Sequence, residues 1–215
     1  MLTLIKREIG DSIVFFILTV LGVFLSVSHL VYNFMKFNET IQLIGVPLTM
    51  YKIFGSFPFT FLPLIACAFG ALQMYLDKSK GVSSFLATLA TNRRQILAAK
   101  MITGVLWLLL MIVPFAVTDV VLLKMFPRAA LPDAGFLADV FVTVFLCCLS
   151  CYIFGLMVGW YSGKLLPALS VILVTVMLFS LIAIKGISFQ TNAIFVLFIT
   201  AALVRTWQKF MSTAL

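Results

Sequence analysis

Charged side chains are scarce in this sequence. They make up 10% of the 215 residues, whereas 63% of the residues are hydrophobic. Soluble domains carry about 25% charged and roughly 45 to 50% apolar residues. A chain so poor in charge would expose apolar patches larger than water tolerates, so we exclude a soluble globule and expect lipid to be its main solvent. The composition also excludes disordered, collagen-like and coiled-coil chains.

Residues that carry enzyme chemistry are scarce as well. His29 is the only histidine, which excludes the His-Glu-x-x-His motif of zinc proteases, and no Gly-x-Ser-x-Gly elbow of serine hydrolases is present. A Walker phosphate loop is excluded at residues 162–164, because Val158 replaces its first glycine and Leu165 its metal-binding hydroxyl. We therefore expect no catalytic site, no cofactor and no metal site on this chain.

Small uncharged residues recur in the apolar segments and indicate close helix packing. All four cysteines lie there: Cys67, Cys147, Cys148 and Cys151. Because only one Cys-x-x-Cys pair exists and the histidine is distant, we interpret these thiols as packing residues, not metal ligands. Two overlapping Gly-x-x-x-Gly repeats are formed by Gly155, Gly159 and Gly163. This spacing lets helix backbones approach closely, and we favour packing within the chain over a contact between two copies.

Six apolar stretches are long enough to cross about 30 Å of hydrocarbon as helices that rise about 1.5 Å per residue. They lie at 12–32, 55–75, 101–123, 136–160, 165–184 and 187–204. None has a charge near its middle, where a charge would cost about 2.5 to 3.5 kcal/mol. The runs are continuous, whereas barrel strands alternate. The predicted fold is an all-α integral membrane protein, a single transmembrane domain over residues 1–215 with six transmembrane helices.

Lysine and arginine in the loops predict the orientation. If the N-terminus is cytoplasmic, ten of the 15 basic residues are inside: Lys6, Arg7, Lys78, Lys80, Arg93, Arg94, Lys100, Lys164, Arg205 and Lys209. Five are outside: Lys36, Lys52, Lys124, Arg128 and Lys185. Because cytoplasmic loops carry the basic excess, both termini are predicted to be cytoplasmic. The basic residues form no stripe that could follow phosphates, so we expect no nucleic-acid partner.

Two segments outside the spans are amphipathic. In the loop between the second and third spans, one face of a short helix over 82–91 collects apolar residues: Val82, Phe85, Leu86, Leu89 and Ala90. Its other face holds hydroxyl side chains, so it should lie on the inner membrane surface. Residues 1–11 predict an interfacial helix in the same way. The 82–91 helix either simply fills the loop or docks a cytoplasmic partner, and we favour docking.

The inner loop also carries a family pattern: Asp77, Gly81, Leu-Ala-Thr-Leu at 86–89, Arg-Arg-Gln-Ile-Leu at 93–97, and Lys100. Together with the amphipathic lead-in and six spans, it resembles the type 2 permease subunits of ATP-binding-cassette (ABC) exporters. In that family the stretch runs from an acidic residue through a glycine and a leucine-rich turn to a proline, an arginine and a lysine. Here Asp77 stands where glutamate is commoner, and Ala90 or Thr91 replaces the proline.

The resemblance implies a homodimer or heterodimer of such subunits in a bacterial or archaeal cytoplasmic membrane. Each would dock its coupling helix, residues 82–91, onto a separate ATPase subunit that binds ATP and Mg²⁺. The implied docking residues are Ser83, Ser84, Ala87, Thr88, Thr91, Arg93 and Arg94. ATP would close the partner pair, and the coupling helices would switch the spans between inward and outward openings.

The lack of charge at the span centres favours an amphipathic or hydrophobic cargo over an ion, such as a lipid, a lipid-linked molecule or a hydrophobic peptide. Analogy with the family places the pathway along the second and fifth spans, where the polar groups are Thr60, Ser170, Thr175 and Ser180. Asp119 and Asp139 lie near outer span ends. For these we favour structural ion pairs with Lys124, Arg128 or Lys185 over a polar exit rim.

Two other functions stay open at this point. The first is the membrane subunit that captures the substrate of a vitamin importer. Such a subunit also has about six short spans and works with separate ATPase subunits, but it would bind a small ligand tightly by itself in detergent. A membrane scaffold without a transport function is the other alternative, and it would be favoured if no ATPase accompanies the chain.

Overall fold

The computed structural model of the protein describes residues 6, 9–10, 13–44, 57–79, 93–125, 134–159 and 165–212, and these residues form helices and no strand. The long helices are α2 (Ile13–Ile44), α4 (Phe57–Ser79), α6 (Arg93–Met125), α7 (Ala134–Gly159), α8 (Leu165–Lys185) and α9 (Phe189–Ser212). Each coincides with one predicted span. The interfacial helix expected over 1–11 falls mostly outside the described residues, of which Lys6, Ile9 and Gly10 are helical.

Four of these helices are long and apolar enough to cross a membrane. Within the described residues, the candidate spans are Ile13–Tyr32, Arg94–Leu122, Gly135–Gly159 and Phe189–Gln208. The two remaining helices, α4 and α8, contribute shorter apolar runs, Phe61–Leu76 and Leu173–Ile182. The fold is therefore an all-helical bundle with at least four helices suited to a bilayer.

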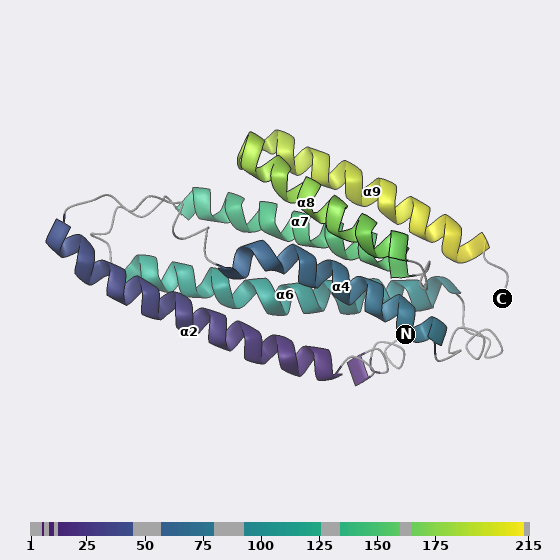
Figure 1. The fold of residues 1–215 in the computed structure, drawn as a ribbon, viewed down its shortest axis with the longest axis horizontal. Helices are drawn as coiled ribbons and strands as arrows, with labels where there is room; N and C mark the ends of the chain where they lie inside the picture. The colour runs from purple at the N-terminus through teal and green to yellow at the C-terminus, as the bar shows by residue number, and fades with distance from the viewer. Residues whose placement is uncertain are drawn as a thin grey trace.

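Helix α7 lies in the middle of the bundle, with α8 and α9 on one side and α4, α6 and α2 on the other (Figure 1). Successive helices run in alternating directions, so the start of α2, the end of α4, the start of α6 and the end of α9 all lie toward one end (Figure 1). We call it the α4–α6 end. The first long helix therefore begins, and the last one ends, at the same end of the bundle (Figure 1).

Glycines bring α4 and α7 into close contact. A Cβ atom on Gly155 would overlap the carbonyl oxygen of Cys67 and lie 3.0 Å from its carbonyl carbon. A Cβ on Gly159 would lie 2.9 Å from Cα of Ala71 and overlap the oxygen of that residue. These positions confirm that the Gly155–Gly159 repeat packs within the chain. Gly163 lies outside the described residues.

Aromatic rings fill the core between α4, α6 and α7. Trp107 and Phe69 stack with ring centroids 4.3 Å apart, and the Tyr152 ring centroid lies 6.1 Å from that of Phe69 with the two planes inclined by 28°. Gly104 makes room for Tyr152, since a Cβ there would overlap the phenol ring. Burying such rings contributes apolar area and a further roughly 0.5 to 1.5 kcal/mol per aromatic pair.

Helix α2 lies at the edge of the bundle and packs along α6. Its outward face exposes large apolar side chains, with Phe24 70% exposed and Leu25 67% exposed. One interhelical bond is formed where the Trp107 indole N–H donates to Oγ1 of Thr19 at 2.9 Å. Such an apolar surface suits lipid contact, as the composition indicates.

Helix α6 begins at Arg93, eight residues before the apolar stretch at 101–123, where Asn92 and Gln95 of the sequence resemble a capping-box start. Since α4 begins at Phe57, Pro58 lies in its first turn, where the missing N–H costs nothing. Only Pro63 and Pro114 lie inside their helices.

Candidate functional site

The α4–α6 end carries the segment that the sequence predicts to dock a partner. The predicted docking residues Ser83, Ser84, Ala87, Thr88 and Thr91 lie between α4 and α6, outside the described residues. Arg93 is the first residue of α6, and Arg94 is its first described side chain. The structure thus defines the two helices that flank this segment, and the docking role of its residues stays a prediction.

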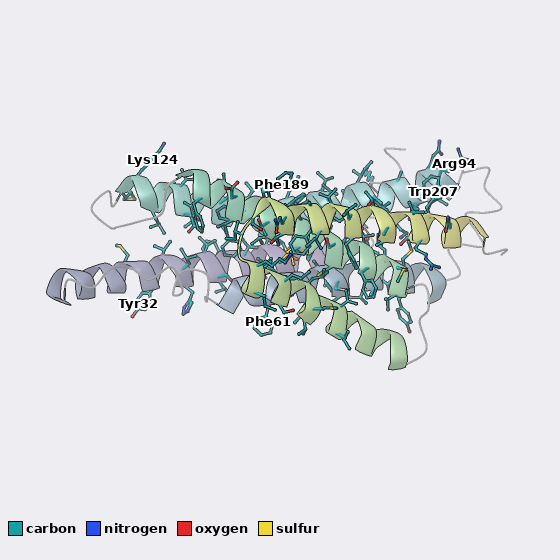
Figure 2. The ribbon with its side chains drawn as sticks, turned by 90° about the horizontal axis from the view of Figure 1, so that it is seen from above. Tyr32, Phe61, Arg94, Lys124, Phe189 and Trp207 are labelled. Atoms are coloured by element: carbon teal, nitrogen blue, oxygen red, sulfur yellow. The ribbon has the colours of Figure 1, made fainter. Side chains whose placement is uncertain are left out.

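Arg94 is held against the last helix of the chain. Its guanidinium carbon lies 5.9 Å from the ring centroid of Trp207 in α9, at the same end of the bundle (Figure 2). Exposed cation–π contacts of this kind contribute about 0.5 to 1 kcal/mol. Tryptophan and arginine are both typical of the membrane–water interface. The pair joins the start of α6 to the end of α9 and presents a positive charge there.

A buried polar cluster joins α4, α6 and α7 close to this end, and its three members are Gln73, Lys100 and Tyr152. Lys100, which the sequence analysis counts among the basic residues of the cytoplasmic side, is fully buried, at 0% exposure. Its Nζ donates to the carbonyl oxygen of Gln73 at 3.3 Å. The Tyr152 hydroxyl lies 2.7 Å from Gln73 Oε1 and 2.8 Å from the Lys100 carbonyl oxygen. Sequence analysis missed this cluster.

The orientation of the Gln73 amide decides how these bonds are shared. A tyrosine hydroxyl has one hydrogen, so it donates to one of its two neighbours at a time. With Oε1 toward Tyr152, the buried Nε2 of Gln73 has no hydrogen-bond partner in the described structure. With the amide turned over, Nε2 donates to the Tyr152 oxygen and leaves the hydroxyl hydrogen for the Lys100 carbonyl, so this orientation satisfies all three groups.

The predicted pathway residues are separated by the fold. Thr175 in α8 is buried, at 3% exposure, so it packs inside the chain in this conformation. Ser180 donates to the carbonyl oxygen of Met177 in its own helix at 2.8 Å. Thr60 and Ser170 lie in α4 and α8, but their side chains are not described. Their assignment to a transport pathway stays a prediction.

The two aspartates differ in their surroundings. Asp139 is exposed, whereas Asp119 is 7% exposed on the buried face of α6. Oδ2 of Asp119 makes no hydrogen bond to any described residue. The expected ion pair through that oxygen is therefore not formed within the described part of the chain. Lys124 is exposed at the far end of α6, and Arg128 lies outside the described residues.

A second bond between helices, also missed by sequence analysis, lies far from the α4–α6 end. Thr143 in α7 and Asn192 in α9 bring their side-chain oxygens 2.9 Å apart, and Thr143 also bonds the Asp139 carbonyl at 2.8 Å. The Asn192 amide fits best with its nitrogen toward Thr143, because the single hydroxyl hydrogen is needed for the carbonyl. Polar residues in two apolar spans were the signal that could have indicated this bond.

The four cysteines are free and buried between helices, which confirms their interpretation as packing residues. Within the described residues, no group of three or more His, Cys, Asp or Glu side chains could hold a metal ion. Comparison with protein-family models, with curated proteins and with solved structures finds no match for this chain. Its function has to be inferred from its own residues and their geometry.

Proposed function

We propose that the chain is the transmembrane permease subunit of an ABC transporter. It crosses the membrane six times with both termini in the cytoplasm, pairs with a second permease subunit, and exports an amphipathic or hydrophobic cargo. A separate ATPase subunit supplies the energy. The all-helical bundle, its apolar surface and the pattern in the α4–α6 segment support this proposal.

One observation carries the proposal: α4 and α6, which flank residues 80–92 in the sequence, are joined to each other within about two turns of the end of α4 and of the start of α6. The Lys100 ammonium reaches from α6 to the Gln73 carbonyl in α4 at 3.3 Å. A partner that moves the amphipathic segment 82–91 would therefore act on both helices together. The exposed Arg94 beside it adds a positive charge suited to an acidic partner surface.

The transport cycle follows from a population shift. ATP binding closes the ATPase pair, the two coupling segments move with it, and the spans change from an inward to an outward opening. A ligand drives such a change only by its different affinity for the two states. The cargo enters where apolar helix faces meet lipid. An ion is not the expected cargo, because the few charges along the spans could not replace its hydration shell.

The first experiment is affinity purification of the tagged chain from its native membrane, followed by identification of the proteins that accompany it. We expect an ABC ATPase, and we expect Arg94→Glu to reduce its recovery. Lys124→Glu is the matched control, because it reverses a charge on the same helix at the opposite end (Figure 2). Trp207→Ala separates the loss of charge from the loss of the Arg94–Trp207 contact.

Three outcomes contradict the proposal: no ABC ATPase accompanies the chain, Arg94→Glu retains it fully, or Lys124→Glu loses it equally. Recovery of no ATPase at all favours a membrane scaffold. A small ligand that stays bound to the purified chain in detergent favours the capture subunit of an importer. For cargo, we expect ATP-dependent movement of a fluorescent phospholipid across proteoliposomes that contain both subunits, and none with the permease alone.

A further inference from the structure

We propose that Asp119 is a proton-binding site that holds the last part of α6, residues 115–125, against the bundle. With the proton bound, the carboxyl group is neutral and stays packed in the position that the structure shows. When the proton leaves to water, the 115–125 segment turns about Pro114 and brings the carboxylate out of the apolar core. The proton site is a property of the chain alone, and its use in a transport cycle rests on the proposed function.

Asp119 lies in an apolar stripe of α6. It follows Phe115 by four residues and precedes Leu122 by three, so the three side chains share one face of the helix. Phe115 and Leu122 are buried, and Asp119 is buried to the same degree, with 7% of its surface exposed. Its Oδ2 atom has no hydrogen-bond partner in the described structure. A carboxyl oxygen is thus enclosed where the turns before and after it place apolar side chains.

The described side chains around Asp119 supply no charge that would balance a carboxylate. Helix α6 packs against α2, α4, α7 and α9. Asp119 lies twelve residues beyond Trp107, so the Thr19–Trp107 hydrogen bond places it beside α2 near residue 31, twelve residues beyond Thr19. The described titratable groups toward this end of the four helices are exposed: His29 and Tyr32 in α2, Asp139 in α7 and Lys124 in α6 itself. In α4 and α9 the charged residues lie toward the α4–α6 end: Asp77, Lys78, Arg205 and Lys209.

An ionised carboxylate is not stable in this position. An unpaired carboxylate loses so much solvation on moving from water into apolar surroundings that the group takes up a proton instead. Ionisable side chains within membrane helices therefore pair with another group or face water. Asp119 is paired with no described residue and is almost fully enclosed. The packed conformation consequently favours the neutral acid, with one proton taken from water.

The helix is weakened at Pro114, five residues before Asp119. Pro114 has no backbone N–H, so it cannot donate to the carbonyl oxygen of Leu110 four residues earlier. Its own carbonyl oxygen accepts a hydrogen bond from Oγ1 of Thr118 at 2.7 Å. Proline inside a helix and a threonine that bonds the preceding turn are both known causes of helix bending. The 115–125 segment can therefore change direction while the rest of α6 stays in place.

Together, the enclosed carboxyl group and the proline make the position of this segment depend on pH. The packed state binds one proton at Asp119 and the released state binds none. The ratio of released to packed molecules therefore rises by up to about tenfold for each unit of pH. Acid favours the packed state and alkali the released one. An aspartate that served only to fill space would give no such dependence.

The first test is infrared spectroscopy of the purified full-length chain in detergent at about pH 5, where an ordinary aspartate is mostly ionised. We expect a contribution from a protonated carboxylic acid that Asp119→Asn removes. Asp139→Asn is the matched control, because it replaces an exposed aspartate near the same end of the bundle, and it should retain this contribution. Retention of the contribution in Asp119→Asn, or its equal loss in Asp139→Asn, would refute the proton site.

The second test is hydrogen–deuterium exchange of the same preparation, read by mass spectrometry on peptides from 115–125 and corrected for the intrinsic effect of pH on amide exchange. Between about pH 5 and about pH 9, we expect the corrected exchange of the wild-type chain to rise about tenfold or more. Asp119→Asn should keep the segment protected at both pH values, because its amide carries no charge at either. Pro114→Ala restores the backbone donor and should make the rise at least about threefold smaller.

Peptides from 140–150 in α7 serve as the internal control and should keep the same corrected exchange at both pH values. The switch is refuted if the wild-type 115–125 segment does not respond to pH, if Asp119→Asn responds as the wild type does, or if the 140–150 peptides rise equally. An equal rise in Pro114→Ala contradicts the hinge. Since no ATPase is present, these results are independent of the co-purification experiment, and either proposal can fail without the other.

Discussion

Adding a methyl group at Gly155 tests how closely α4 and α7 depend on each other. In Gly155→Ala the new Cβ would lie 3.0 Å from the carbonyl carbon of Cys67 and 3.1 Å from the amide nitrogen of Ala71, and closer still to the Cys67 oxygen. All three neighbours are backbone atoms, which cannot move aside as a flexible side chain does. Ordinary contact begins near 3.4 Å, so the two helices must separate by at least about 0.4 Å.

The expected cost follows from overpacking, which costs typically about 1 to 3 kcal/mol in a well-packed core. The backbone neighbours place Gly155→Ala toward the upper part of this range. Gly22→Ala is the matched control: this helical glycine of α2 has nothing within 4 Å of its Cβ position. There the better helix propensity of alanine should stabilise the protein by up to about 1 kcal/mol.

The assay is equilibrium unfolding of the purified protein in mixed micelles, followed by circular dichroism during a denaturing-detergent titration. We expect a lower free energy of unfolding for Gly155→Ala and an equal or higher one for Gly22→Ala. A combined Gly155→Ala, Gly159→Ala variant should lose less than the sum of the two single changes, because one separation of the helices relieves both contacts. An unchanged free energy of unfolding in Gly155→Ala would refute the close approach of α4 and α7.

Three further predictions concern single groups. Thr19→Val removes the hydroxyl that accepts from the Trp107 N–H and should lower the free energy of unfolding by roughly 0.6 to 1.7 kcal/mol. Trp107→Phe should cost more, because it also removes one ring of a fully buried side chain. The double variant should cost little more than Trp107→Phe, and fully additive costs would contradict the bond. Asp119→Asn removes a buried carboxylate whose Oδ2 has no described partner, so the same titration should show an equal or higher free energy of unfolding. A marked decrease would mean that the carboxylate is paired in solution. The four buried thiols should resist a water-soluble maleimide in the folded protein and react after unfolding, as counted by intact mass, and rapid labelling of the folded chain would contradict their burial.

The positions of the helices could be predicted because lipid-spanning segments are continuous apolar runs. Each expected span overlaps one observed helix, and four of these helices are long and apolar enough to cross a membrane. The glycine repeat at Gly155 and Gly159 packs as expected. The helix ends were less predictable. Helix α2 has 32 residues, about 48 Å, because a helix that has crossed the hydrocarbon continues until a local signal stops it, and apolar content does not mark that point.

The Gln73–Lys100–Tyr152 cluster could not be predicted, because its members are far apart in sequence. A lysine at the edge of an apolar run usually extends toward the headgroups, and Lys100 directly precedes the apolar stretch at 101–123. Its burial depends on Tyr152, which lies 52 residues later and is brought beside it only when α7 packs against α6. The sequence could have indicated the cluster only through polar residues that lie at similar depths in the membrane on three helices. That depth is known only approximately from sequence.

The glycine contacts between α4 and α7 also determine which parts of the molecule can turn against each other. At Gly155 and Gly159 no side chain separates the backbones of α4 and α7. A sliding or twisting motion between these two helices would therefore bring backbone atoms into collision with the carbonyl groups of Cys67 and Ala71. Helices α4 and α7 would then travel as one body during any rearrangement. Relative motion is easier between helices whose contact is made by side chains. The contact of α2 with α6 is of this kind, and its hydrogen bond between Thr19 and Trp107 can break and re-form.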